Sequence, residues 1–313
     1  MIDVKKIRIL YMGTPEMSAE LLEHLLVQQY NIVGVVAQGD QKVGRKQLIQ
    51  EVPTKVIASK YGIPVFQPIK IKHDYGFISD LNPDLILCFA YGQMIPEEVL
   101  VQPKYGALNF HGSILPKYRG AAPIQYALMN NDDKSGVCLM EMVKKMDAGR
   151  VFALETFALE LSDNYESAAQ KIVSASKMLV DKYLQKYIDG ELVGTPQDES
   201  LVTFAPSIKS EEERINLGLN VKEVFGLIRA LSPQIGAYVI YKEQPLKIFE
   251  VELVGYSEKY EAGTIIKADK SGFHIQFKGG VLSVKSLQKA GKKKVGYKDF
   301  INGEKDLLVT KVF

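Results

Sequence analysis

The sequence is poor in cysteine and contains no C-x-x-C pair. Its two cysteines, Cys88 and Cys138, lie 50 positions apart, and no histidine is spaced with them as in a zinc site. Neither a disulfide framework nor a structural zinc site is indicated, and a reducing compartment fits this cysteine usage best. We therefore predict a cytoplasmic protein with no bound metal.

Long apolar runs and nucleotide-binding motifs are also missing. The first apolar stretch, Ile7–Tyr11, is far shorter than a membrane span or a signal peptide, so we expect no association with a membrane. The turn Gly13–Pro15 lacks both the G-x-G-x-x-G pattern and the Walker lysine, which excludes those two nucleotide sites. With 46% hydrophobic and 24% charged residues, the chain is typical of a soluble globular protein.

Charge is distributed unevenly along the chain. The net charge is +2, but residues 209–313 hold 18 basic and 13 acidic residues, a net +5, and residues 1–208 carry −3. Nine lysines and one aspartate fall between Lys267 and Lys298. Such asymmetry is typical of a surface that binds a polyanion, although a solvated lysine-rich face would look the same.

The first 190 residues show the pattern of an α/β domain. Apolar β-rich runs alternate with helical or loop-length intervals, which predicts a parallel sheet with strands at residues 7–11, 32–37, 64–66, 84–89, 107–110 and 136–142. A helix should follow the first strand, with the Thr14 hydroxyl as its cap and Pro15 at its first position. Open sheets bind ligands beyond the carboxyl ends of their strands, so the loops after Phe89 and Phe110 are the first candidates for a site.

A second domain is expected because 313 residues exceed what one core usually serves. An amphipathic helix over residues 165–187 ends at Asp189-Gly190, and the polar stretch 191–208 has no sustained period. Beyond a helix at 221–231, glycine turns separate short β-rich runs, which predicts a small β-barrel with strands at 237–241, 246–253, 263–268, 272–277 and 281–287. The predicted domains are therefore 1–190 and 209–313, joined by a linker at 191–208.

The stretch Ala107–Ala122 holds the best candidates for catalysis. Asn109 and His111 share one face of a strand end, where an amide can stabilise an oxyanion and an imidazole can move a proton near neutral pH. Asp147, in a glycine-bearing loop after another strand, could orient His111 or accept its proton. Taken alone, a structural Asn and His and a turn-forming Asp would explain the same residues.

Three further loops carry candidate binding residues. Phe89–Pro96 leaves a strand with exposed backbone that could hold a flat heterocycle, or it is only a hydrophobic loop. The basic residues within 40–46 and the Lys292–Lys294 turn could contact phosphates. Solvated surface loops would have the same composition.

Taken together, several motifs resemble the methionyl-tRNA formyltransferase family. The resemblance rests on Asn109-x-His111-Gly-Ser113-Ile-Leu-Pro116 and Arg119-Gly120-Ala-Ala-Pro123-Ile, with Asp147 36 positions after His111. It extends from Met12-Gly13-Thr14-Pro15-Glu16 almost to the C-terminus, through Thr203-Phe204-Ala205-Pro206, Gly236-Ala237-Tyr238 and Leu287-Gln288-Lys289-Ala290-Gly291. The chain departs from the family at Gln38-Gly39-Asp40, which is commonly Gln-Pro-Asp, and at Ser232-Pro233-Gln234-Ile235, which lacks an expected Trp.

This resemblance implies a Rossmann-like formyltransferase domain followed by a C-terminal barrel similar to an oligonucleotide-binding (OB) fold. It implies Asn109, His111 and Asp147 as catalytic residues and 10-formyltetrahydrofolate as co-substrate, with no metal. The implied folate contacts are Phe89, Ala90, Tyr91, Gly92, Met94, Ile95, Ser113, Ile114, Leu115 and Pro116.

The implied partner is methionyl initiator tRNA, which such an enzyme formylates for translation initiation, and we expect a monomer. The implied tRNA contacts are Lys42, Arg45, Lys46, Lys292, Lys293 and Lys294. One alternative is a formyltransferase for an amino-sugar nucleotide, which would share the donor and the catalytic residues but would have no use for a lysine-rich barrel. Another is a tRNA-binding module with an inactive enzyme domain, against which the intact Asn, His and Asp argue.

Overall fold

The chain packs as two units, each built from separate stretches of sequence. The computed structural model describes residues 2–43, 47–256, 258–304, 307–308 and 310–313. The first unit comprises Met1–Ala121, Ser135–Phe157 and Ala169–Ala205, and the second comprises Ala122–Lys134, Ala158–Ala168 and Pro206–Phe313. The chain therefore leaves the first unit twice before the main segment of the second begins.

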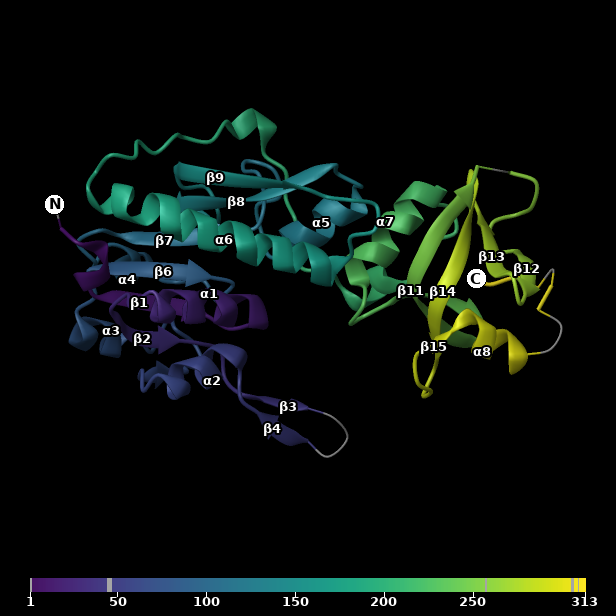
Figure 1. Ribbon diagram of the computed structural model, residues 1–313, viewed down its shortest axis with the longest axis horizontal. Coiled ribbons are helices and arrows are strands. Elements are labelled where there is room, and N and C mark those ends of the chain that lie inside the picture. The colour runs from purple at the N-terminus through teal and green to yellow at the C-terminus, as the bar shows by residue number, and fades with distance from the viewer. Residues whose placement is uncertain (1, 44–46, 257, 305–306, 309) are drawn as a thin grey trace. The chain divides into compact units, whose positions relative to one another are not determined.

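One sheet forms the centre of the first unit (Figure 1). In the described part of the chain it has seven strands in the order β5-β2-β1-β6-β7-β8-β9, and the neighbouring strands from β5 to β7 are parallel. Both faces of β1 and β6 are buried, as expected of central strands in an α/β sheet. The bounds are β1 (Ile9–Gly13), β2 (Ile32–Val36), β5 (Val65–Phe66), β6 (Leu85–Phe89), β7 (Ala107–His111), β8 (Lys134–Glu141) and β9 (Val151–Ala158).

The far edge of this sheet corrects the predicted all-parallel arrangement. β8 runs antiparallel to β7, and β9, which was not predicted, forms the edge. A parallel pair needs a crossover that carries the chain back over the sheet. Between β7 and β8 the chain forms only the short helix α5 (Pro123–Met129), which packs against α7 (Val221–Leu231) within the second unit.

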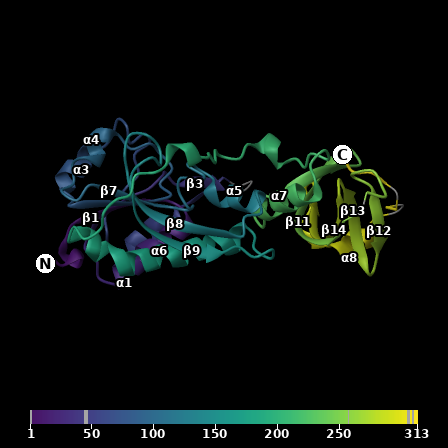
Figure 2. The same ribbon diagram turned by 90° about the horizontal axis from the view of Figure 1, so that it is seen from above.

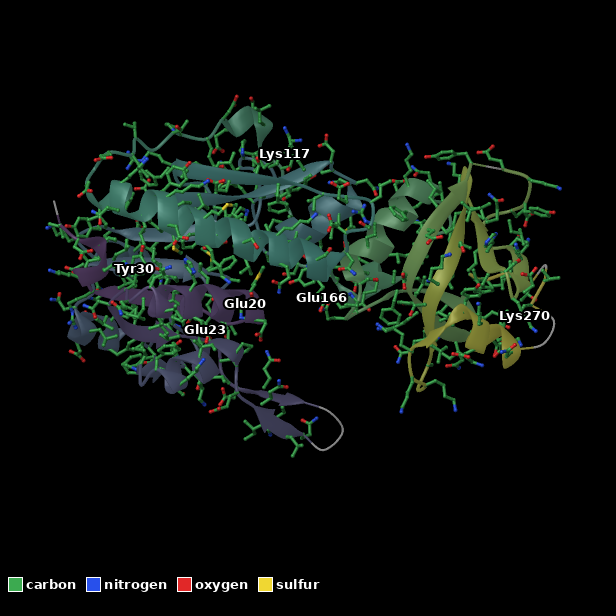
Figure 3. The ribbon with its side chains drawn as sticks, viewed as in Figure 1. Glu20, Glu23, Tyr30, Lys117, Glu166 and Lys270 are labelled. Carbon is green, nitrogen blue, oxygen red and sulfur yellow. The ribbon has the colours of Figure 1, made fainter. Side chains whose placement is uncertain are left out.

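Helices cover both faces of the sheet. Figure 2 shows α1 (Glu16–Val27) and α6 (Tyr165–Ile188) on one face and α3 (Gly76–Leu81) and α4 (Glu97–Leu100) on the other. Figure 3 labels Glu20 and Glu23 on α1. Glu20 accepts a hydrogen bond from Gln170 of α6 at 2.9 Å, and Glu23 pairs with Lys60 of α2 (Pro53–Lys60) at 2.7 Å. The predicted helix over 165–187 is confirmed. Among the described helices, none combines the length and apolar character that crossing a bilayer requires.

The predicted helix cap at Thr14 is wrong. α1 begins at Glu16 after Pro15, and no side chain caps it. Thr14 Oγ1 instead donates to the carbonyl oxygen of Tyr91 at 3.0 Å and accepts from the backbone N–H of Gln38 at 3.1 Å. The hydroxyl thus joins the chain segments that follow β1, β2 and β6, beyond the carboxyl ends of the strands, where open α/β sheets bind ligands.

An antiparallel sheet and α7 form the core of the second unit. The strand order is β10-β11-β14-β13-β12, with β15 beside β14, and Val224 and Ile228 of α7 belong to the same buried cluster as Ile248 and Leu282. The five predicted strands and the predicted helix at 221–231 are confirmed. The bounds are β10 (Ala237–Tyr241), β11 (Gln244–Gly255), β12 (Ile265–Asp269), β13 (Gly272–Phe277), β14 (Gly280–Lys289), β15 (Val295–Gly296) and α8 (Tyr297–Asn302).

Residues 310–313 close this sheet into a barrel. The backbone of the segment bonds to Gly263 and to Ile265 of β12 at 2.8 and 2.9 Å. On its other side it bonds to Ile240 of β10 at 2.8 Å, and the Val312 side chain is fully buried. The segment therefore completes a hydrogen-bonded ring between β12 and β10, which confirms the predicted barrel.

The second unit also gathers its two N-terminal stretches around α7. Arg229 donates to the carbonyl oxygens of Asp163 and Glu160, both at 2.6 Å. At Gly226, a Cβ would lie 2.4 Å from the carbonyl oxygen of Met129, so only glycine lets α5 approach α7 this closely.

Candidate functional site

The end of β7 places His111 next to Asp147, as the sequence predicts. His111 Nδ1 lies 3.6 Å from Asp147 Oδ1, and the two side chains are 5% and 14% exposed. A separation of 3.6 Å is too long for a direct hydrogen bond. Catalytic contacts often tighten only when substrate binds, or act through one water, so the pair remains a candidate for proton transfer.

The other ring nitrogen of His111 is held by the backbone. Nε2 lies 2.9 Å from the carbonyl oxygen of Tyr118, and because a carbonyl only accepts, Nε2 carries the hydrogen. Tyr118 has φ +62°, a left-handed conformation that few residues of this size adopt. This carbonyl fixes the orientation of the ring, so that Nδ1 faces Asp147.

The Asp147 carboxylate is oriented by two loops. Its Oδ2 accepts a hydrogen bond from the backbone N–H of Gly120 at 2.8 Å, which leaves Oδ1 toward the imidazole. Asp147 itself has φ +51°, a conformation that Asp tolerates better than most residues. At Gly149 a Cβ would lie 1.9 Å from the carbonyl oxygen of Glu141, so the loop that carries Asp147 requires glycine there.

Asn109 is half-buried and lies two residues before His111 on the same face of β7. Its backbone is held in the sheet opposite Cys88 of β6 and Met140 of β8. Within the described part of the chain, no hydrogen bond engages the Asn109 side chain. The amide is therefore available to a ligand at the carboxyl end of the strand.

The two neighbouring cysteines do not act as nucleophiles. Burial raises the pKa of the Cys88 thiol to about 12 and that of Cys138 to about 11. Because only a thiolate is strongly nucleophilic, neither cysteine is reactive at neutral pH.

Among the described residues, no three His, Cys, Asp or Glu side chains gather as metal ligands would.

The predicted folate residues in the loop after β6 fall into an exposed group and a buried group. Ala90, Gly92 and Met94 are exposed, whereas the side chains of Phe89, Tyr91 and Ile95 are buried. The buried three pack into the first unit beneath the loop. The exposed three present backbone and one flexible apolar side chain.

The turn after β7 carries the remaining predicted folate residues. The Ser113 hydroxyl is fully buried and donates to the carbonyl oxygen of Lys117 at 2.6 Å. Cys138 Sγ donates to the Ser113 carbonyl oxygen at 3.2 Å. Ser113 therefore stabilises the turn, and the side chains of Ile114, Leu115 and Pro116 are half-buried.

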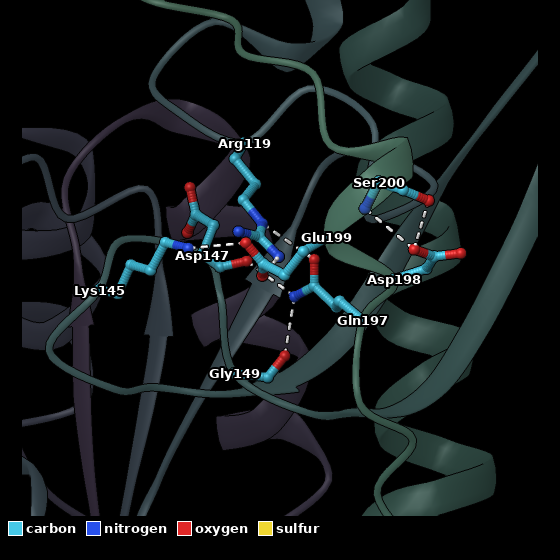
Figure 4. Close-up of polar contacts among 8 residues, drawn as sticks. All are labelled: Arg119, Lys145, Asp147, Gly149, Gln197, Asp198, Glu199 and Ser200. Atoms are coloured by element: carbon cyan, nitrogen blue, oxygen red, sulfur yellow. Dashed lines mark hydrogen bonds and ion pairs between the residues drawn. The ribbon is translucent and has the colours of Figure 1, made fainter.

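A polar network beside Asp147 was not predicted from the sequence (Figure 4). Arg119 is 1% exposed and donates to Gln197 Oε1 at 3.0 Å and to Glu199 Oε1 at 2.8 Å. The hydrogen bonds from Arg119 and from Lys145, the latter at 2.7 Å, lower the pKa of Glu199 to about 2. Arg119 lies inside a motif of the sequence, but Gln197 and Glu199 fall in a polar stretch with no period that would single them out.

The predicted tRNA contacts that the structure describes are exposed. Lys42 is exposed on the hairpin of β3 (Gln41–Val43) and β4 (Leu48–Gln50), and Arg45 and Lys46 lie outside the described residues. Lys292, Lys293 and Lys294 are exposed in the turn after β14, where the Lys294 ammonium lies 4.8 Å from the Phe249 ring centroid. Neither Lys292 nor Lys293 pairs with an acidic residue in the described part of the chain, so both can meet phosphates.

Comparison with known proteins places this site in a family. The chain matches the family model for formyl transferase over residues 5–182 and that for the formyl transferase C-terminal domain over residues 207–305. A methionyl-tRNA formyltransferase of Lactobacillus acidophilus is 42% identical over 305 residues, which cover 96% of this chain and 97% of that protein. The chain belongs to the methionyl-tRNA formyltransferase family. A second member of this family, from Bacillus cereus, is 39% identical and covers 98% of both chains.

Solved structures share the fold with this family member at low identity. HypX from Aquifex aeolicus, in complex with tetrahydrofolic acid, superposes with a TM-score of 0.64 at 18% identity, over 93% of this chain and 46% of that one. The sugar 3N-formyl transferase WlaRD, in the presence of dTDP and 5-N-formyl-THF, gives 0.63 at 18% identity, over 92% and 99%. Methionyl-tRNA formyltransferase from Clostridium thermocellum gives 0.55 at 17% identity, over 79% and 93%. These similarities confirm the predicted formyltransferase fold.

Proposed function

We propose that this protein transfers the formyl group of 10-formyltetrahydrofolate to the α-amino group of methionyl initiator tRNA, for translation initiation. One observation carries the proposal: His111 and Asp147 lie 3.6 Å apart beside Asn109 at the ligand-binding edge of the sheet. The full-length similarity to methionyl-tRNA formyltransferases supports the choice of acceptor. Formyl transfer needs an oxyanion stabilised and a proton moved, and these side chains supply both.

In the proposed reaction the amino nitrogen attacks the formyl carbon, and the carbonyl oxygen becomes an oxyanion. The Asn109 amide donates a hydrogen bond to that oxygen, and a positively charged His111 ring stabilises the negative charge. Both ring nitrogens face an oxygen atom: Nε2–H donates to the Tyr118 carbonyl, and Nδ1 lies 3.6 Å from Asp147 Oδ1.

The same step requires a proton to leave the attacking amine and reach the departing folate nitrogen. Asp147 is the proposed carrier, directly or through one water. Its Oδ2 is engaged by the Gly120 N–H, so Oδ1 is the oxygen that accepts the proton. As the bond between the formyl carbon and folate N10 breaks, the proton passes to N10 and the new amide bond remains on the methionine.

We assign the two substrates to different parts of the chain. The folate is held by the exposed Ala90, Gly92 and Met94 and by the half-buried Ile114–Pro116 segment, which offer backbone and apolar contacts. The tRNA is bound by the predicted domain 209–313 through Lys292, Lys293 and Lys294, and by Lys42, Arg45 and Lys46. All three catalytic residues belong to one unit of one chain, and we propose a cytoplasmic monomer.

The test is an assay with two acceptors in parallel. The purified protein is incubated with 10-formyltetrahydrofolate and either methionyl initiator tRNA or an amino-sugar nucleotide. Formyl-methionine released by deacylation is measured in the first case and the formylated sugar in the second. We expect formyl-methionine with the wild-type protein and none with His111→Ala. Formylation of the sugar alone would overturn the proposed acceptor while leaving the catalytic residues in place, and transfer to neither acceptor would overturn both.

A further inference from the structure

The segment 195–205, here named the strap, is bonded to the loops of the proposed site. At its start, Thr195 and Val151 exchange two backbone hydrogen bonds of 2.8 and 2.9 Å. At its end, the backbone of residues 203–205 bonds to both the N–H and the carbonyl of Arg119, at 2.9 and 2.8 Å. The strap therefore belongs to the first unit, although its sequence has the composition of a linker.

Gln197 is the residue of the strap that contacts the Asp147 loop. Its amide nitrogen donates to the carbonyl oxygens of Asp147 at 2.8 Å and Gly149 at 2.7 Å. Its amide oxygen accepts from Arg119 Nε at 3.0 Å (Figure 4). Both donors and the acceptor are thus used, and they fix the backbone of the residue that carries the carboxylate.

The same strap supports the loop that holds His111. The Tyr118 N–H donates to Thr203 Oγ1 at 2.9 Å, and the Tyr118 carbonyl holds the imidazole. At Gly120, which donates to the Asp147 carboxylate, a Cβ would lie 2.6 Å from the Ala205 carbonyl oxygen. Two loops from different parts of the sequence are therefore held in one relative position by the strap.

From these contacts we infer that Gln197 is a positioning residue for formyl transfer, which holds the Asp147 carboxylate in place for proton transfer. The inference rests on the proposed function. It assigns Gln197 no contact with substrate and no effect on substrate binding. Asp147 has φ +51°, in the sparsely populated left-handed region, and such a backbone conformation persists only where surrounding contacts hold it.

Gln197→Glu tests this with little change of shape. The substitution keeps the oxygen that accepts from Arg119 but replaces both N–H donors with an oxygen that faces two carbonyl oxygens. We expect kcat to fall about 10- to 100-fold, in the range of other misplaced catalytic groups, while KM for both substrates stays within about twofold. Asp198→Asn is the neighbouring control, because within the described residues the hydrogen bonds to that side chain come from Ser200, and kcat should be unchanged.

A double-mutant comparison separates positioning from simple destabilisation. In an Asp147→Asn background the carboxylate is already gone, so adding Gln197→Glu should lower the single-turnover rate by less than about threefold. A general loss of folded protein would lower the single-turnover rate by the same factor in both backgrounds. Equal losses in the two backgrounds, or a wild-type kcat in Gln197→Glu, would overturn the inference.

The outcomes are distinguishable from failure of the proposed function. If the wild-type protein formylates an amino-sugar nucleotide and not tRNA, the same variants are measured with that acceptor, and the expected losses are unchanged. The ratio of rates between the variants then supports or overturns the positioning role of Gln197, independently of which acceptor the wild-type protein uses.

Discussion

At the scale of single residues, Asn109 differs from the other two proposed catalytic side chains. His111 and Asp147 are each held by a backbone group, at 2.9 and 2.8 Å. The Asn109 amide has no such contact within the described chain. Its donors are therefore not used by the fold, which makes Asn109 the most direct test of the proposed oxyanion stabilisation.

Replacing Asn109 with alanine should lower kcat about 100-fold or more, the range observed when an oxyanion donor is removed elsewhere. KM for both substrates should change little, because the lost hydrogen bond forms mainly in the transition state. Steady-state kinetics and a thermal melt check this together. A lower melting temperature with nearly normal kcat would show that Asn109 is structural.

The Arg119 network makes stability depend on pH through Glu199. Its pKa is lowered to about 2 in the folded state, below the unfolded value of about 4.3. A carboxyl with a lowered folded pKa contributes stability that is complete above the unfolded value and is lost as the pH falls through the folded value. The contribution of Glu199 should therefore disappear between about pH 4.3 and pH 2.

Glu199→Gln tests this dependence. The variant should be less stable than the wild-type protein at pH 6, and the difference should shrink as the pH approaches 2. Urea unfolding at several pH values measures the gap. Glu98→Gln, an exposed glutamate of α4 outside the network, should show no such convergence. A difference in stability that did not change with pH would mean that the charge of Glu199 does not contribute to stability.

The residues that the sequence predicts are those whose role is local. Asn109 and His111 are two apart on one strand, so their shared face follows from strand geometry. Thr14 and Gln197 were assigned wrongly or not at all, because their partners lie 77 and 50 positions away. No local pattern encodes such a contact. The two strand ends offered the pairing of His111 with Asp147 as one possibility, and the resemblance to a family made it specific.

At the scale of elements, the apolar pattern of the sequence predicted which helices and strands exist better than it predicted the direction in which a strand runs. α6 and the strands of the second unit carry full apolar periods between clear turns, and they form where expected. The reversed direction of β8 is set by its connection and is not written in its own residues. Helices as short as α3 and α4 contain too few turns to show a period.

The closing segment of the barrel gives a prediction at this scale. Val312→Ala removes two methyl groups from a fully buried side chain and should lower the free energy of unfolding by about 2 kcal/mol. Phe313→Ala is the control, because that side chain is 60% exposed and its backbone bonds to Ile240 remain. Denaturant unfolding compares the two. Equal effects would show that the segment is not part of the core.

At the scale of the whole molecule, the basic charge of the second unit has no complete internal counterpart. Lys242 and Lys289 pair with Glu304, and Lys285 pairs with Glu252. Lys292 and Lys293 have no such partner among the described residues. Exposed unpaired lysines are suited to a phosphate backbone, and their binding energy should depend on salt.

Lys292→Glu combined with Lys293→Glu should raise KM for tRNA and leave KM for folate unchanged. In a plot of the logarithm of the tRNA binding constant against the logarithm of salt concentration, the slope should decrease by about 1 for each lost phosphate contact. Titration of tRNA at several salt concentrations provides the measurement. Lys70→Glu with Lys72→Glu makes the same charge change on the first unit, where it should have less effect.

The interleaving of the two units determines what can fold while the protein is being synthesised. α5 leaves the ribosome 92 positions ahead of the start of α7, and Ala127 and Leu128, buried in the finished protein, are apolar. Until α7 emerges, the nascent chain exposes this helix without its partner, a state that favours aggregation. Synthesis halted before Val221 would therefore yield not a smaller working enzyme but a chain with an uncovered apolar helix.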